Sequence, residues 1–138
     1  MKTQNKITVS GKRKEAIAKA TIYSGTGVIR INKMPIEIFP FLRRLELLEP
    51  IRIAEDVLKE QSKIFNIDVS VKSGGAEAQI EASRLAIARA IVLFTGSQEL
   101  KKAYLNYDRS LLVADVRRKE QRKPGDSKAR ARRQKSYR

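Results

Sequence analysis

Three consecutive cations, Lys12, Arg13 and Lys14, follow Gly11 near the start of the chain. Neighbouring Lys and Arg side chains are typical of phosphate contacts, because each carries a positive charge and several hydrogen-bond donors. Successive side chains of an extended segment point to opposite faces, so one or two of the three can reach an RNA backbone while the others contact solvent. A merely solvated loop is the alternative. We predict RNA binding here because the whole chain has a formal net charge of +15.

A second group of cations lies at the end of the sequence, in residues 117–138. This segment contains eleven Lys or Arg residues and two carboxylates. Arginine suits bidentate phosphate contacts and stacks on bases, and an extended segment can thread where a globular surface cannot go. Nonspecific electrostatic attraction is the alternative. We predict RNA contacts for Arg117, Arg118, Lys119, Arg122, Lys123, Lys128, Arg130, Arg132 and Arg133.

Two further features have weaker links to chemistry. Ser73-Gly74-Gly75 precedes a predicted helix, where glycines let a backbone approach a phosphate. The segment lacks the Lys-Ser/Thr of a P-loop and the spacing of a dinucleotide fingerprint, so an ordinary strand-to-helix turn is the favoured interpretation. Arg84 and Arg89 lie among alanines on the same helix, where they either approach an RNA backbone or are solvated on its outer face.

Composition excludes several classes of protein. The 138 residues include no Cys and no His, which excludes disulfide frameworks, zinc fingers, Cys nucleophiles and His-dependent triads. No apolar stretch approaches the ~20 residues of a membrane span, and the first ten residues lack the apolar core of a signal peptide. We therefore expect a cytoplasmic protein that binds a polyanion, with no membrane, small-molecule substrate, cofactor or metal.

The charge and apolar residues divide the chain into two regions. Residues 1–116 have a net charge of +6, and residues 117–138 have +9. After residue 116 no aliphatic side chain is larger than Ala, so the tail cannot bury enough apolar surface to offset its ordering entropy. We predict a folded domain over 1–116 and an extended tail, mobile until bound, over 117–138.

The first half of the domain contains patterns of both strand and helix. Residues 7–10 and 16–23 are predicted strands, and the glycine-containing turn at 24–27 predicts a hairpin between 16–23 and 28–32. Apolar residues recur at helical spacing over 41–59, where Pro50 is expected to divide two helical pieces.

The second half of the domain supplies the predicted core. Ile67, Val69 and Val71 alternate with polar residues, which indicates a strand with one buried face. Residues 79–94 form an Ala-rich amphipathic helix, the predicted central helix. Gly96 is its expected C-cap, and Ser97 is expected to cap a short helix ending near Lys102. Together these elements predict an α/β (α+β) domain.

Four segments of the sequence resemble a known family. They are Gly11-Lys12-Arg13-Lys14-Glu15-Ala16-Ile17-Ala18, the Ser73-Gly74-Gly75 turn with the Ala-rich helix from Gln79 to Ala90, Asp115-x-Arg117, and the ending Lys128-Ala129-Arg130-Ala131-Arg132-Arg133-Gln134-Lys135-Ser136-Tyr137-Arg138. They resemble the universal small-subunit ribosomal protein S-nine family, and the ending is similar to its archaeal and eukaryotic branch. The departure from the bacterial pattern is Ala76-Glu77-Ala78, which stands where bacterial members have further glycine and serine.

The resemblance implies both a fold and a function. The implied fold is a two-layer α/β sandwich of the ribosomal S-five second-domain type. The implied partners are small-subunit rRNA in the head, neighbouring head proteins and peptidyl-site tRNA. In this family the end of the tail approaches that tRNA, which corresponds here to Lys135, Ser136, Tyr137 and Arg138.

Two other functions are compatible with the composition. The first is another basic RNA- or DNA-binding architectural protein, such as a nucleoid protein, for which the charge is equally suitable. The second is a small-molecule kinase, because certain kinases share the implied two-layer fold. The short body, the missing phosphate-loop Lys or Ser and the lack of an evident catalytic base argue against an enzyme.

Overall fold

The computed structural model describes residues 6–59, 65–124, 128–131 and 137. Its described part contains five strands, three α-helices and two short 3-10 helices. In chain order they are β1 Ile7–Arg13, β2 Ala16–Ser24, β3 Ile29–Ile31, β4 Met34–Pro35, η1 Ile36–Ile38, α1 Phe41–Leu58, β5 Phe65–Lys72, α2 Ala76–Thr95, α3 Gln98–Tyr107 and η3 Arg109–Leu111. The mixed α/β class predicted from the sequence is confirmed.

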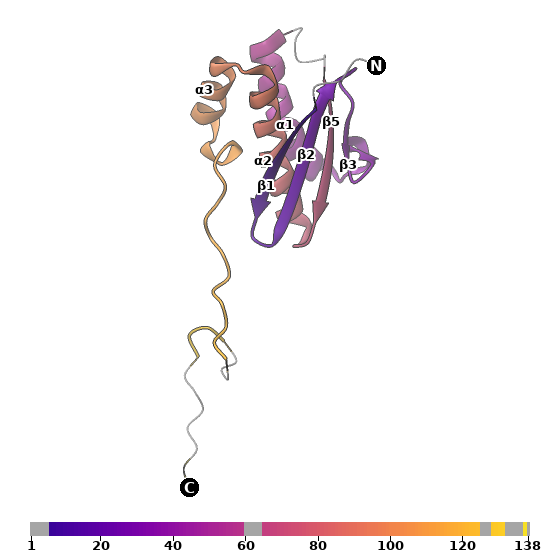
Figure 1. Ribbon diagram of the computed structural model, residues 1–138. Coiled ribbons are helices and arrows are strands. Elements are labelled where there is room, and N and C mark those ends of the chain that lie inside the picture. The colour runs from indigo at the N-terminus through magenta and orange to yellow at the C-terminus, as the bar shows by residue number, and fades with distance from the viewer. Residues whose placement is uncertain (1–5, 60–64, 125–127, 132–136, 138) are drawn as a thin grey trace.

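The strands form one mixed sheet in the order β1-β2-β5-β3-β4. β1, β2 and β5 are antiparallel neighbours, whereas β3 is parallel to β5. The helices lie against one face of this sheet, with α2 next to β1, β2 and β5 and α1 beside α2 (Figure 1). Burial alternates along β5 as predicted, with Ile67, Val69 and Val71 facing α2 and exposed Asp68 and Ser70 between them.

The predicted hairpin between residues 16–23 and 28–32 is wrong, because β5 lies between β2 and β3. The loop after β2 folds around Asn66 at the start of β5. The side-chain oxygen of Asn66 accepts hydrogen bonds from the backbone N–H groups of Thr26 and Val28, both at 2.9 Å. This loop therefore directs β3 to the far side of β5, and the pairing depends on a residue about 40 positions away in the sequence.

The predicted division of residues 41–59 at Pro50 is also wrong, since α1 is one continuous helix. The Pro50 ring is buried, and the hydroxyl of Tyr104 in α3 donates a 2.6 Å hydrogen bond to the Pro50 carbonyl. Proline inside a helix removes one backbone hydrogen bond and crowds the preceding turn. Packing of α3 on this point compensates for that cost.

The predicted central helix is confirmed as α2, and it lies very close to β1. Ile80, Ile87, Ala90 and Ile91 are buried, and half-buried Phe94 packs edge-on against Phe65 at a ring separation of 5.9 Å. The Ala-rich composition permits this close packing, because small side chains let a helix approach the sheet backbone.

The end of α2 follows the predicted capping. Gly96 has the left-handed conformation, with φ of 64°, and the Ser97 hydroxyl accepts a hydrogen bond from the backbone N–H of Leu100. The next helix continues to Tyr107, beyond the predicted end near Lys102. Leu111 is the last fully buried residue of the described chain. The chain then continues along the body to the β1–β2 turn and leaves it as an extended segment beyond that point (Figure 1).

Candidate nucleic-acid interface

The three cations near the start of the chain do not point the same way. Lys12 lies in β1 on the face opposite α2 and is exposed, and Lys14 is exposed in the turn that joins β1 to β2. Arg13 points to the helix side, as strand alternation requires. Two of the three cations are therefore available to an external phosphate.

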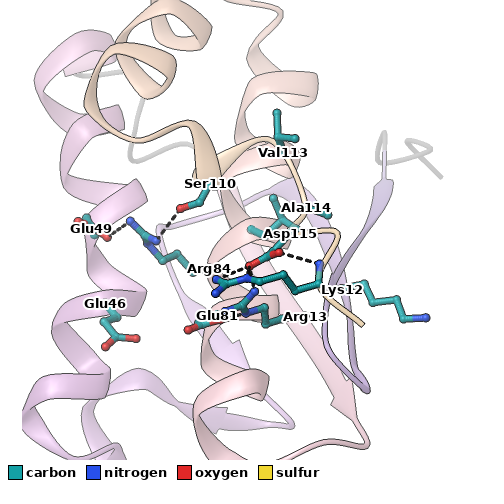
Figure 2. A pocket seen from close by; sticks show the side chains of 12 residues that line it. Lys12, Arg13, Glu46, Glu49, Glu81, Arg84, Ser110, Val113, Ala114 and Asp115 are labelled. Atoms are coloured by element: carbon teal, nitrogen blue, oxygen red, sulfur yellow. Dashed lines mark hydrogen bonds and ion pairs between the residues drawn. The ribbon is translucent and has the colours of Figure 1, made fainter. Parts of the chain in front are cut away.

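Arg13 makes its contacts inside the protein. Its side chain is only 16% exposed and forms ion pairs with Glu81 of α2 and with Asp115, just beyond η3 (Figure 2). From the sequence, Arg13 was predicted to be one of the RNA-binding residues. The structure instead uses its charge to join β1, α2 and the segment that leads into the tail.

The start of the tail is fixed to the β1–β2 turn. The Asp115 carboxylate accepts hydrogen bonds from both the backbone N–H and the side-chain Nε of Arg117, each at 2.8 Å. The guanidinium of Arg118 donates to the backbone carbonyl of Lys14 at 2.8 Å. These contacts place the exposed lysines Lys12 and Lys14 near the point where the basic tail leaves the body.

Further along the tail, the described cations are exposed. These are Lys119, Arg122, Lys123, Lys128 and Arg130. Arg130 pairs with Glu120, and the paired guanidinium lowers the pKa of that carboxyl while the carboxylate raises the pKa of Arg130. Tyr137 is 87% exposed. The other predicted contact residues, Arg132, Arg133, Lys135, Ser136 and Arg138, lie outside the described residues.

The two arginines of α2 act inside the fold. Arg84 pairs with Glu49 of α1 and Asp108 before η3, and only 17% of its side chain is exposed. Arg89 donates to the carbonyls of Leu112, at 2.9 Å, and Ser10, at 3.0 Å. Both guanidiniums have partners within the fold, so neither residue is the solvated outer-face arginine that was one alternative from the sequence.

The Ser73-Gly74-Gly75 segment is a strand-to-helix turn, the interpretation favoured from the sequence. Gly74 has a φ of +73°, and a Cβ there would lie 2.8 Å from the backbone nitrogen of Ala16. The Gln79 side chain donates to the Ser73 carbonyl at 3.1 Å. Glu77, in the first turn of α2, places a carboxylate where a bound phosphate would need positive potential and pairs with Arg43. The turn therefore lacks the features of a phosphate loop.

Three further cations lie together on the exposed face of the sheet. Lys19, Arg30 and Lys72 lie on exposed strand positions of the sheet face opposite α2. In the sequence, Lys19 and Lys72 alternate with apolar residues, which indicates that they lie on the exposed face of their strands. Only the strand order shows that these cations lie on neighbouring strands of one sheet.

Comparison with known proteins shows the family of this chain. A family model described as Ribosomal protein S9/S16 matches residues 11–138. This chain belongs to that family. It is 49% identical to the small ribosomal subunit protein uS9 of Methanococcus vannielii over 131 residues, which cover 93% of this chain and 95% of that relative. It is 46% identical to uS9 of Thermoplasma volcanium over 133 residues, 96% of this chain and 98% of the relative.

Membership of the ribosomal protein S9/S16 family confirms the predicted resemblance, and these relatives are archaeal, in agreement with the predicted branch. The chain is a structural protein of the small ribosomal subunit and not an enzyme. Within the described residues, no helix is long and apolar enough to cross a bilayer. The residues that contact nucleic acid remain predictions.

Proposed function

We propose that this protein binds small-subunit rRNA in the head of the subunit and extends its basic tail toward peptidyl-site tRNA. The observation that carries this proposal is the fixed exit of the tail, where Arg118 contacts the carbonyl of Lys14 beside exposed Lys12. The proposed rRNA contacts are Lys12, Lys14, Arg117, Arg118, Lys119, Arg122, Lys123, Lys128, Arg130, Arg132 and Arg133. Arg13 is omitted because its charge is already paired with two carboxylates.

The length of the tail supports a contact far from the body. An extended chain spans at most about 3.3 Å per residue, so the 22 residues of 117–138 can reach about 70 Å. We assign the tRNA contact to Lys135, Ser136, Tyr137 and Arg138, on the resemblance of the terminal sequence to the family. Neighbouring head proteins are the other proposed partners. We also propose the S-five second-domain type of fold, which is supported by the mixed sheet with helices against one face.

Sedimentation tests the proposed place of the protein in the cell. We expect a tagged full-length chain to sediment with small ribosomal subunits in a sucrose gradient. It should remain with the subunits after the lysate has been treated with a DNA-specific nuclease. A chain that sediments with DNA or with free RNA would support a nucleoid or other architectural protein instead.

A salt titration tests the proposed role of the tail cations. The variant R122Q/K123Q/K128Q removes three exposed charges, and R52Q/K101Q/K102Q removes three exposed charges from the helices. Because each neutralised phosphate releases counterions, we expect the tail variant to lower the log-log salt slope of rRNA binding by about two to three units. The helix variant should change this salt slope by less than about one unit. Equal slopes for the two variants would contradict direct tail contacts.

A further inference from the structure

The sheet face opposite α2 carries a group of cations that we call the open-face cations. Strand alternation and the neighbouring loops place them there: Lys6, Lys12, Lys19, Arg30, Lys33 and Lys72. Asp68 is the carboxylate that the described strands contribute to the same face. No described helix covers this face, as Figure 1 shows for the side of the sheet turned away from α1 and α2. The body is therefore electrostatically two-sided.

The helix layer contrasts with this face. The described helices α1, α2 and α3 together carry seven cations and seven carboxylates. The body's ion pairs among the described residues form on that side or at the start of the tail, through Arg13, Arg43, Arg84 and Arg117. Within the described chain, none of the open-face cations forms an ion pair. Like charges left unpaired on one face repel each other, and a polyanion removes that repulsion.

Hydroxyl groups lie between the open-face cations. Ser10, Lys19 and Ser70 are in register across β1, β2 and β5. The next row contains Thr8 and Thr21, whose hydroxyl oxygens are 3.1 Å apart. A shallow hollow of about 630 Å³ opens over these rows. Hydroxyl groups both donate and accept hydrogen bonds, so they suit phosphate oxygens and ribose hydroxyls alike.

Tyr23 adds an aromatic group at the end of the face. Its hydroxyl donates to Asp68 at 3.0 Å, and the Lys6 ammonium lies 5.6 Å from the ring centroid. The Asp68 carboxylate is thus held by a neighbour on the same face. Its negative charge remains, and it opposes an approaching phosphate.

We propose that this open face is a second RNA-binding surface, which takes the sugar-phosphate backbone of an rRNA segment distinct from the path of the tail. The proposal rests on the proposed function and extends the rRNA contacts from Lys12, Lys14 and the tail to the rest of the open face. An RNA partner fits better than a protein partner, because protein interfaces have an apolar or aromatic core and are depleted in Lys. Here the centre of the face is Lys19 with two serines, and Ile17, 42% exposed, lies beside Lys12 and Lys72.

Photo-crosslinking in assembled small subunits identifies what covers the face. The variants Lys19→p-benzoylphenylalanine and Ser70→p-benzoylphenylalanine place a photoreactive group at its centre. Incorporation of the protein into small subunits tests the proposed function, and the identity of the crosslinked partner tests the present proposal. We expect crosslinks to small-subunit rRNA. Crosslinks only to a protein, or no crosslink from either position in fully assembled subunits, would overturn the RNA surface while leaving the proposed function intact.

Charge-matched variants of the full chain provide a quantitative test. K19Q/R30Q/K72Q and R52Q/K101Q/K102Q each lower the net charge by three, so long-range attraction changes equally. At about 0.1 M salt we expect roughly tenfold weaker rRNA binding for the open-face variant and less than about threefold for the helix variant. Equal weakening by the two variants would overturn the proposal.

A single substitution on the same face changes binding in the opposite direction. Asp68→Asn removes the negative charge but keeps an oxygen that accepts the Tyr23 hydrogen bond. We expect about two- to threefold tighter rRNA binding for this variant. The control Glu55→Gln, which removes an exposed carboxylate from α1, should give no such gain. No gain for Asp68→Asn over Glu55→Gln would count against a phosphate backbone at this face.

Discussion

Arg13, the last residue of β1, forms an ion pair with Asp115, which lies just before the basic tail. Its Nη1 contacts Asp115, and its Nε contacts Glu81 of α2, so one planar side chain links three segments. Asp115 in turn holds Arg117, the first residue of the basic tail. A cation placed in a motif that suggested RNA contact thus determines where the tail leaves the body.

A double-mutant cycle on Arg13→Gln and Asp115→Asn measures this link. Removing the partly buried Arg13 leaves Glu81 without its cation and Asp115 with Arg117 alone, and we expect a loss of about 2 kcal/mol in the free energy of unfolding. Asp115→Asn alone should cost less, since Arg13 keeps Glu81. We expect a coupling energy of about 1 kcal/mol from urea denaturation. Additive single effects would mean that the Arg13–Asp115 pair contributes no stability.

Gly11 should tolerate no larger residue. A Cβ at this position would lie 2.3 Å from the carbonyl oxygen of Ala82 and 2.8 Å from the backbone nitrogen of Ala86. Because both atoms belong to the backbone of α2, Gly11→Ala must separate β1 from the helix, and we expect a loss of about 3 kcal/mol or more.

Gly75→Ala is the matched control for Gly11→Ala. No heavy atom lies within 4 Å of a Cβ built at Gly75, and its φ of −88° suits any residue. We expect a change of less than about 0.5 kcal/mol in thermal or urea unfolding. Similar losses for the two glycine variants would show that β1 does not pack on α2 as described.

Tyr104→Phe tests how Pro50 is accommodated inside α1. The change removes the buried hydroxyl that donates to the Pro50 carbonyl and leaves the ring in place. We expect a loss of about 1 kcal/mol, measured by urea denaturation. Tyr107→Phe removes an exposed hydroxyl that donates to Glu49, and we expect no measurable change in the free energy of unfolding. If Tyr104→Phe left the free energy of unfolding unchanged, ring packing alone would support the helix at Pro50.

Asp108→Asn should have an effect that depends on pH. The hydroxyl of Ser110, with a smaller contribution from Arg84, lowers the pKa of the Asp108 carboxyl in the folded protein. The stabilisation is therefore present above the unfolded pKa of about 3.9 and is lost as pH falls through the folded pKa. Asparagine keeps an acceptor for the Ser110 N–H, but its NH2 group replaces the oxygen that accepts from the Ser110 hydroxyl and from Arg84. The substitution therefore removes the charge together with these two hydrogen bonds.

The expected size of this effect is small because the Asp108 side chain is 37% exposed and solvent screens its charge. At pH 7 we expect the free energy of unfolding, measured by urea denaturation, to be about 0.5 kcal/mol higher for wild type than for Asp108→Asn. The difference should shrink below about pH 4. A difference that stays constant from pH 7 to pH 3 would contradict the electrostatic origin.

Deletion of residues 135–138 tests the proposed tRNA contact. The deletion removes two of the eleven tail cations, so a tail that serves only as a counterion for rRNA would lose little. If these residues contact tRNA phosphates at a wet, screened surface, each contact is worth about 1 kcal/mol. We expect near-normal subunit assembly and several-fold faster tRNA dissociation from the peptidyl site. Equal dissociation rates at low salt would leave the tail as an rRNA-binding segment.

The elements that could be predicted from the sequence are those with local causes. Ile67, Val69 and Val71 mark their strand because alternation with polar residues has only one simple explanation, a sheet with one buried face. Gly96 and Ser97 end one helix and begin the next through contacts within four residues. The uneven distribution of charge also separates the tail from the body without any structural information.

The tertiary structure decided the features that depend on distant residues. Asn66 holds the loop after β2 through two hydrogen bonds, and Tyr104 lies against Pro50 from a helix that begins nearly 50 residues later. The sequence also does not distinguish the roles of Lys12 and Arg13, because they are adjacent residues with the same charge. The strand pleat turns Arg13 toward Glu81 and Asp115 and leaves Lys12 in solvent. Composition thus predicts a polyanionic partner, whereas the fold decided which of the described cations are exposed and outside ion pairs.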